Sequence, residues 1–217
     1  MKILITGSSS GIGKAIAEKY LKEGHEVVGL DTQNATIIDK NYRHILCDVR
    51  ENLPEESGVN VVVTSAGIQL PDEETVDVNL NGTIRTVEKY AFQPAIRSVL
   101  TIASASGTTG SEFPRYAASK GGVIAYTKNV ALRLSEYGAT ANSLSPGGVY
   151  TRSNAVVLDD PALKEEALNE SLLHKWATVE EIAEFAYFLT VVNKSMTGQD
   201  VLVDNGEAVK SNFVWKE

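Results

Sequence analysis

Short apolar runs without polar alternation recur along the chain and alternate with longer stretches of helical spacing. The runs at 3–5 and 61–63 consist only of isoleucine, leucine and valine. A strand with one face in water would show polar residues at every second position, so these runs predict strands covered on both faces. Strand character is found in seven segments, 2–6, 26–30, 44–46, 59–65, 98–103, 139–144 and 200–203. The pattern predicts an α/β fold, a doubly wound parallel sheet of the Rossmann-like type in three α/β/α layers.

Helix signals fill the intervals between these strands. The first predicted helix covers 12–23. A long helix is predicted to end at Gly138, because glycine is common just after the last turn of a helix. Gly121 and Gly122 lie early in the long helix at a cost of about 1 kcal/mol each relative to alanine. They therefore indicate a close backbone contact, with the sheet or with a second subunit. Two further helices carry N-terminal signals, in the pairs Thr178–Glu181 and Asp160–Pro161.

Composition limits the class of protein. A chain of 217 residues suits one domain, here 1–217, and the formal net charge of −8 disfavours nucleic acid and anionic membranes as partners. The one cysteine, Cys47, excludes an internal disulfide and fits a reducing compartment. We find no signal peptide, no membrane-spanning run and no metal-ligand spacing. The expected location is the cytoplasm, with no membrane partner and no metal.

Small residues crowd the junction between the first strand and the first helix, in "TGSSSGIG". Strand, glycine turn and helix in this order predict a dinucleotide site. Gly7 would permit the tight turn, Gly11 the approach of a pyrophosphate, and Gly13 the close packing of helix on strand. The helix N-terminus would supply free N–H groups and partial positive charge to the phosphates. A purely structural turn would have a similar spacing.

Asp31 ends the second predicted strand, 18 residues after Gly13. A carboxylate at this place accepts hydrogen bonds from the ribose hydroxyls and repels a 2′-phosphate. Together with the absence of a basic residue at Ser10, it predicts NAD rather than NADP. The alternative is that Asp31 is only a turn residue at the start of the loop that follows.

The order of motifs along nearly the whole chain resembles the short-chain dehydrogenase/reductase family. The family's Thr-Gly-x-x-x-Gly-Ile-Gly turn matches 6–13, and Ser65 replaces the asparagine of its Asn-Ala-Gly motif. The other matches are Asp48, Ala66, Gly67, Asn79, Ser104, Tyr116, Lys120, Pro146 and Gly147. Two short connections make the chain similar to compact members, including bacterial hydroxysteroid dehydrogenase/carbonyl reductases.

This resemblance implies an oxidoreductase that moves a hydride between NAD(H) and a secondary alcohol or ketone. It assigns catalysis to Asn79, Ser104, Tyr116 and Lys120. The residues expected at the cofactor are Gly7, Ser9, Gly11, Ile12, Gly13, Asp31, Asp48, Val49, Ser65, Ala66, Gly67, Tyr116, Lys120, Pro146, Gly147, Val149 and Thr151. Alternatives are an NADPH-dependent carbonyl or 3-oxoacyl reductase and a non-catalytic dinucleotide-sensing regulator. The resemblance also implies a homodimer or homotetramer.

The chemistry of Tyr116 and Lys120 follows from their spacing. They lie one helical turn apart, so their side chains share a face. The Lys120 ammonium and the positive nicotinamide of NAD⁺ would both favour the phenolate and lower the pKa of Tyr116. Tyr116 would then act as general base in oxidation and general acid in reduction, while Ser104 fixes the substrate oxygen. Ser106 is the rival to Ser104, because the interval to Tyr116 is one residue shorter than the family's.

The segment from about 150 to 176 is expected to cover the substrate as a lid. Its apolar residues would form a pocket wall or pack the lid on the core, and the sequence favours neither. These residues are Val156, Val157, Leu158 and Leu163.

Overall fold

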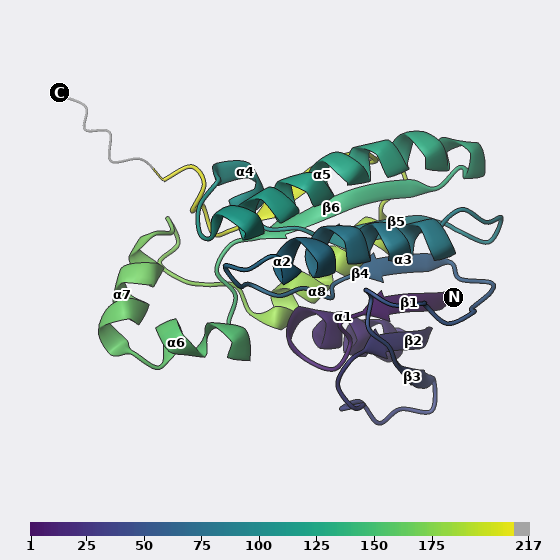
Figure 1. The fold of residues 1–217 in the computed structure, drawn as a ribbon, viewed down its shortest axis with the longest axis horizontal. Helices are drawn as coiled ribbons and strands as arrows, with labels where there is room; N and C mark the ends of the chain where they lie inside the picture. The colour runs from purple at the N-terminus through teal and green to yellow at the C-terminus, as the bar shows by residue number, and fades with distance from the viewer. Residues whose placement is uncertain (211–217) are drawn as a thin grey trace.

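Seven strands lie side by side in the computed structural model, which describes residues 1–210 (Figure 1). Their order is β3-β2-β1-β4-β5-β6-β7, and all neighbouring pairs are parallel. The strands are β1 (Lys2–Thr6), β2 (Glu26–Asp31), β3 (Tyr42–Leu46), β4 (Val61–Thr64), β5 (Ser98–Ile102), β6 (Thr140–Pro146) and β7 (Asp200–Val203). The predicted doubly wound parallel sheet is confirmed, and every predicted strand segment contributes to it.

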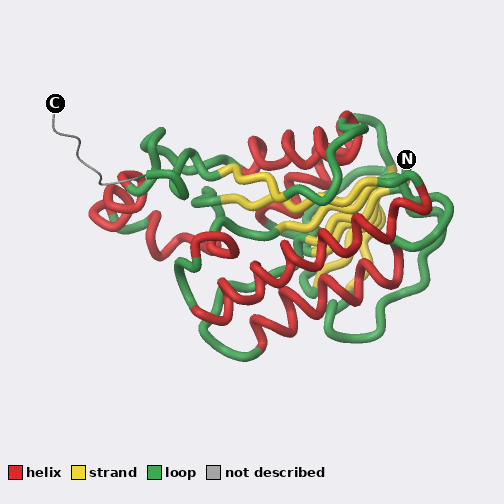
Figure 2. Tube along the Cα trace, turned by 90° about the horizontal axis from the view of Figure 1, so that it is seen from above, coloured by secondary structure: helices red, strands yellow, loops and turns green. Residues whose placement is uncertain are grey.

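Helices cover both faces of this sheet (Figure 2). The α-helices are α1 (Gly11–Lys22), α2 (Glu74–Val76), α3 (Gly82–Tyr90), α4 (Ser106–Thr109), α5 (Pro114–Leu134), α6 (Ala155–Leu158), α7 (Pro161–Asn169) and α8 (Val179–Tyr187). Shorter 3-10 and π turns extend them, η1 (Asp77–Asn81), η2 (Ser135–Tyr137), η3 (Arg152–Asn154) and η4 (Phe188–Val192). No helix within residues 1–210 is long and apolar enough to cross a lipid bilayer.

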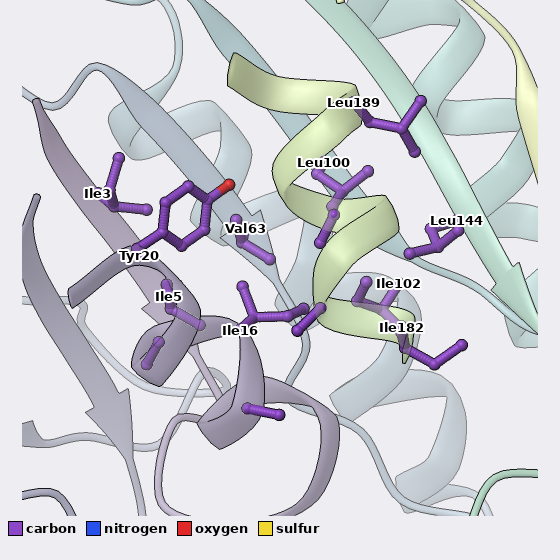
Figure 3. Close-up of a cluster of buried hydrophobic side chains, with 14 of the residues drawn as sticks. Ile3, Ile5, Ile16, Tyr20, Val63, Leu100, Ile102, Leu144, Ile182 and Leu189 are labelled. Atoms are coloured by element: carbon purple, nitrogen blue, oxygen red, sulfur yellow. The ribbon is translucent and has the colours of Figure 1, made fainter. Parts of the chain in front are cut away.

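One face of the sheet is buried under α1 and α8. Ile3 and Ile5 of β1 pack there with Ile16 of α1 and Ile182 of α8 (Figure 3). Tyr20 is fully buried in the same cluster, and its hydroxyl is hydrogen-bonded to Thr190. The apolar burial of this cluster fixes α1, and with it the glycine turn at its start, against the sheet.

The opposite face is buried under α3 and α5. Leu4 of β1 and Val62 of β4 pack with Val87 of α3 and Val130 of α5. Because β1 and β4 present alternate residues to the two clusters, neither strand has a solvated face. This arrangement explains the continuous apolar runs in the sequence.

The capping residues identified in the sequence mark the ends of helices in the structure. Thr178 and Glu181 form the complete capping box of α8, and Asp160 accepts hydrogen bonds from the first-turn N–H groups of α7. Gly138 adopts a left-handed conformation, with φ 63°. The first helix begins and ends one residue earlier than predicted.

The two glycines near the start of α5 contact other helical segments. A β-carbon on Gly121 would lie 3.2 Å from the carbonyl oxygen of Gly107 in α4, and one on Gly122 would lie 2.8 Å from Leu80 of η1. The predicted close backbone contact is present, but its partner is α4 and not the sheet. The contact holds α4 beside the N-terminal end of α5 (Figure 1).

Candidate active site

The predicted site residues gather at one edge of the sheet. Gly7 follows β1, Asp31 ends β2, Ser65 follows β4, Ser104 follows β5 and Gly147 follows β6. All strands are parallel, so their carboxyl ends meet at the same edge. The strand order reverses between β1 and β4, and ligands of open α/β sheets bind in the crevice at such a point.

The glycine turn between β1 and α1 has no room for side chains at Gly7 and Gly13 and leaves open space above Gly11. Gly7 has φ 72°, and a β-carbon on Gly13 would lie 2.1 Å from the carbonyl oxygen of Gly7. Above Gly11, whose φ is 52°, the nearest atom to a β-carbon would be Thr151 Cγ2 at 3.8 Å. Ser10 makes no side-chain cap, so its hydroxyl does not take the first N–H groups of α1. This turn fits the pyrophosphate of a dinucleotide, with Thr151 beside it.

Replacing Gly13 with alanine should push α1 away from the turn. Because the added methyl group meets backbone rather than a flexible side chain, we expect a loss of about 1–3 kcal/mol in the free energy of unfolding, and weaker NADH binding. Urea unfolding and NADH fluorescence titration measure the two effects. Ser10→Ala, in the same turn but exposed, is the control and should be nearly neutral. Equal stability of the two variants would contradict the packing role of Gly13.

Asp31 is held rigidly beside the turn. It is 9% exposed, and its Oδ2 accepts a hydrogen bond from the backbone N–H of Ser9 at 2.9 Å. Its Oδ1 accepts from the N–H of Gln33 at 2.8 Å, which is the turn geometry that the alternative interpretation requires. A carboxylate has further acceptor capacity beyond these two bonds, so the same side chain also fits a ribose. The Ser9 side chain donates to the Gln33 carbonyl at 3.3 Å, and Ile12 lies in the first turn of α1.

Asp48, which the resemblance places at the adenine, is paired with a neighbouring cation. The guanidinium of Arg50 contacts both carboxylate oxygens, with Nη2 2.7 Å from Oδ2, and this lowers the pKa of Asp48. Val49 is buried against Gly82. An adenine would therefore meet an Asp48–Arg50 pair rather than a free carboxylate.

The Ser65-Ala66-Gly67 segment lies between the turn and the catalytic residues. The backbone N–H groups of Ser65 and Ala66 both donate to Thr6 Oγ1 at 3.1 Å. A β-carbon on Gly67 would lie 3.2 Å from Asn79 Oδ1 and 3.5 Å from Lys120 Nζ. Gly67 therefore keeps a space open between Asn79 and Lys120.

Asn79 of η1 is fixed by three hydrogen bonds to residues outside that turn. Its Oδ1 accepts from the N–H of Ile68 at 2.8 Å, and its Nδ2 donates to the Ile68 carbonyl at 2.9 Å and to Ser119 Oγ at 3.2 Å. Ser119 directly precedes Lys120 on α5. Asn79 thus ties the segment after β4 to the helix that carries Lys120.

Ser104 and Tyr116 come together although they lie on different elements. Burial raises the pKa of Tyr116 to about 12, and the nearby Ser104 hydroxyl acts in the opposite direction by a smaller amount. Ser106 lies behind Ser104, since Ser104 Oγ donates to Ser106 Oγ at 3.2 Å. Of the two rival serines, Ser104 is the one that interacts with Tyr116.

Lys120 lies inside the protein beneath Tyr116. It is 6% exposed, its Nζ donates to the Ile102 carbonyl at 3.0 Å, and Nζ is 5.7 Å from the centre of the Tyr116 ring. Burial lowers the pKa of Lys120 to about 8. Burial of the phenol is the largest influence on the pKa of Tyr116, and the lowering of that pKa by Lys120 together with the nicotinamide of NAD⁺ stays a prediction.

The segment after β6 brings Pro146 and Gly147 to the same edge, where the Gly147 N–H donates to Val203 at 3.1 Å. Val149 is 3% exposed and packs in the cluster with α1 and α8. Its side chain is therefore part of the core, and only its backbone is available to a nicotinamide carboxamide.

Sequence reasoning missed Glu112, which is in the loop between α4 and α5. Its Oε1 accepts a hydrogen bond from Ser106 Oγ at 2.9 Å, and its negative charge raises the pKa values of Tyr116 and Lys120. The available signal was that Glu112 is the one acidic residue between Ser104 and Tyr116 in the sequence.

Comparison with known proteins gives a consistent result. The model of the enoyl-(acyl carrier protein) reductase family matches residues 58–207. D-beta-hydroxybutyrate dehydrogenase of Rhizobium meliloti (strain 1021) is 30% identical over 252 residues, which cover 94% of this chain and 96% of that protein. The 3-oxoacyl-(acyl-carrier-protein) reductase of Chlamydia pneumoniae is 27% identical over 239 residues, with coverage of 94% and 96%.

A solved structure with similar topology is a putative 2-deoxy-D-gluconate 3-dehydrogenase from Agrobacterium tumefaciens with bound NADP. It superposes with a TM-score of 0.89 at 26% identity, over 96% of each chain. The part of the chain that the family model matches includes Ser104, Tyr116 and Lys120, and the two relatives and the solved structure each cover 94% or 96% of the chain. The chain is an oxidoreductase and belongs to the short-chain dehydrogenase/reductase family.

Proposed function

We propose that the chain transfers a hydride between NAD(H) and a secondary alcohol or its ketone, with Tyr116 as general acid and base. The observation that carries this proposal is the arrangement of Ser104, Tyr116 and Lys120 at the carboxyl edge of the sheet, beside the glycine turn. The test is turnover of a panel of alcohols with NAD⁺ and of ketones with NADH, followed by NADH absorbance. A protein that binds NADH and turns over no member of the panel would overturn the proposal and favour a dinucleotide-sensing regulator.

Each catalytic residue has a distinct role in this reaction. The dinucleotide supplies or accepts the hydride when it is bound. Ser104 hydrogen-bonds the substrate oxygen, and Tyr116 exchanges a proton with it. Lys120 provides positive charge near the phenol, and the space beside Gly67 suits a water molecule between Asn79 and Lys120. These two residues then connect Tyr116 to a source of protons.

The cofactor is proposed to lie along the crevice from β2 to β6. The turn at 7–13 binds the pyrophosphate, Asp31 the ribose, Asp48 and Val49 the adenine, and 65–67 the centre of the crevice. Tyr116, Lys120, Pro146, Gly147, the Val149 backbone and Thr151 surround the nicotinamide half. The backbone N–H groups of the turn at 7–13 suit the phosphates of a dinucleotide, and the Asp31 carboxylate suits its ribose hydroxyls.

NADH should bind more tightly than NADPH. A 2′-phosphate would face the Asp31 carboxylate, and like charges about 4 Å apart repel by about 1–4 kcal/mol between aqueous and surface dielectric constants, which predicts a preference of about tenfold or more. Fluorescence titration gives both Kd values, and Asp31→Asn should narrow their ratio. Tighter binding of NADPH would instead favour the alternative, an NADPH-dependent carbonyl or 3-oxoacyl reductase, the activity that the Chlamydia relative's name describes.

Residues 150–176 are proposed to act as the substrate lid of a single domain that covers 1–217. Helices α6 and α7 extend beyond the end of the sheet (Figure 1). Val156 is 81% exposed, and the two buried clusters of the described chain include no residue of 150–176. This exposure favours a role against a ligand over a role in core packing.

The protein is proposed to work in the cytoplasm as a homodimer or homotetramer. Leu132 of α5 is exposed, as are Phe185 of α8, Phe188 of η4 and Leu202 of the edge strand β7. A second copy of the chain would cover such residues, in agreement with an interface formed by the long helix and the C-terminal segment.

A further inference from the structure

The loop between α4 and α5 places a carboxylate two hydrogen bonds away from Ser104. Ser104 Oγ donates to Ser106 Oγ at 3.2 Å, and Ser106 Oγ donates to Glu112 Oε1 at 2.9 Å. From the segment that follows β4, Gln69 Nε2 donates to Glu112 Oε2. The carboxylate is thus fixed from both sides, by Ser106 and by Gln69, while Glu112 itself stays exposed to solvent.

The backbone at Glu112 is strained. Its φ is 70°, in the left-handed region where residues other than glycine, asparagine and aspartate are uncommon. Strained residues of this kind persist where surrounding contacts hold them, and they concentrate at functional sites. A glycine could adopt this backbone conformation without strain. The presence of glutamate therefore indicates that its side chain has a function at this position.

A second carboxylate approaches the same space from the C-terminal side. The Oε2 atom of Glu207 would lie 2.6 Å from a β-carbon on Gly147. Burial raises the pKa of Glu207, and the charge of Glu112 acts weakly in the same direction. No basic side chain hydrogen-bonds either carboxylate in the part of the chain that the structure describes.

We propose that Glu112 is a specificity-determining residue that selects uncharged substrates with a second hydroxyl group near the reacting carbon, and that it rejects substrates with a carboxylate at that position. A carboxylate accepts hydrogen bonds from hydroxyl donors and repels anions. The selection deepens the proposed alcohol–ketone chemistry and rests on it. It also separates this chain from relatives whose substrate is an anion such as hydroxybutyrate.

Three ketones with the same number of carbon atoms test the proposal, namely 4-hydroxy-2-butanone, acetoacetate and 2-butanone, each reduced with NADH. They carry at one end a hydroxyl group, a carboxylate and neither. We expect the wild-type kcat/KM for the hydroxyketone to exceed that for acetoacetate by about tenfold or more. The preference should weaken in about 1 M salt, where the Debye length is about 3 Å.

Glu112→Gln keeps the size of the side chain and removes its charge. We expect it to lower the ratio of the two kcat/KM values to about threefold or less, chiefly by improving acetoacetate. Glu136→Gln is the matched control, since Glu136 is exposed beyond the far end of α5, roughly 30 Å along the helix, and it should keep the wild-type ratio. If Glu112→Gln does not fold, Glu112→Gly removes the carboxylate and suits the left-handed backbone.

The possible results distinguish the role of Glu112 from the alcohol–ketone chemistry on which it rests. A wild-type preference for acetoacetate, or a ratio that Glu112→Gln leaves within about twofold, overturns the role of Glu112 and leaves the alcohol–ketone chemistry intact. A protein that reduces none of the ketones and oxidises no alcohol overturns both.

Discussion

Tyr116→Phe should lower kcat by about 10²- to 10⁴-fold in both directions, the usual contribution of a positioned general acid or base. Phenylalanine keeps the ring in its buried place and removes only the hydroxyl that exchanges a proton with the substrate. Affinity for NADH should change little, so the loss should appear in kcat. Steady-state kinetics together with NADH titration measure the two quantities.

Tyr137→Phe is the control for this substitution. Tyr137 lies in η2 beyond the other end of α5, is exposed, and its change should leave kcat near the wild-type value. Activity of Tyr116→Phe close to that of Tyr137→Phe would exclude Tyr116 as the proton-transfer group.

The pH dependence of the wild-type enzyme follows from the same residue. Burial raises the pKa of Tyr116 to about 12, so the phenol is neutral throughout the usual range of assay pH. Oxidation needs the phenolate, whose fraction grows about tenfold with each pH unit below the pKa. The kcat for oxidation should therefore rise with pH, whereas reduction, which uses the neutral phenol, should stay flat.

The sequence predicted the strands well because their burial is recorded in their composition. Continuous valine and isoleucine runs occur only where both faces of a strand are covered, as in β4. The helical segment from α2 to α3 was harder to predict from the sequence than the strands were. Apolar residues alternate at Val76, Val78 and Leu80, a period of two that imitates a strand, and the π turn η1 accommodates it with Asn79 facing the site. Only the resemblance to a family placed Asn79 on a helix.

The candidate site divides in the same way. Glycines act through their own backbone, and a capping side chain acts on the helix turn directly beside it. Gly7, Gly13 and Thr178 could therefore be interpreted from their sequence neighbours alone. The side chains of Glu112 and Asn79 act through partners that only the folded chain brings near. The same holds for the pKa of Tyr116, which depends on burial by several elements rather than on the spacing to Lys120. Local sequence therefore predicts the frame of the site better than its electrostatics.

Lys120→Met should lower kcat for oxidation by about a hundredfold. A positive charge 5.7 Å from the Tyr116 ring stabilises a phenolate by about 3 kcal/mol at an effective dielectric constant of about 20. Methionine has a similar length and no charge, so it removes this stabilisation and keeps the packing. Lys128→Met, at an exposed position of the same helix, should leave kcat unchanged. Equal rates in the two variants would show that Lys120 does not act on Tyr116.

The same substitution should change stability in a pH-dependent way whose sign is fixed. Burial lowers the pKa of Lys120 from 10.5 to about 8, so between these values the unfolded chain binds more protons than the folded chain. Wild-type stability therefore gains from this group as pH rises from about 8 to 10.5, and below pH 8 the buried charge carries its full cost. Lys120→Met lacks the titration, so its stability relative to wild type should fall by roughly 2 kcal/mol from pH 7 to pH 10. In Lys120→Met the Ile102 carbonyl loses its hydrogen-bond donor at every pH, which shifts the stability difference from wild type by a constant amount. The decisive quantity is therefore the slope of that difference against pH, measured by urea unfolding from pH 7 to pH 10. A difference that does not vary with pH from 7 to 10 would mean that the folded and unfolded chains bind the Lys120 proton equally, and burial would not then lower the pKa of this lysine.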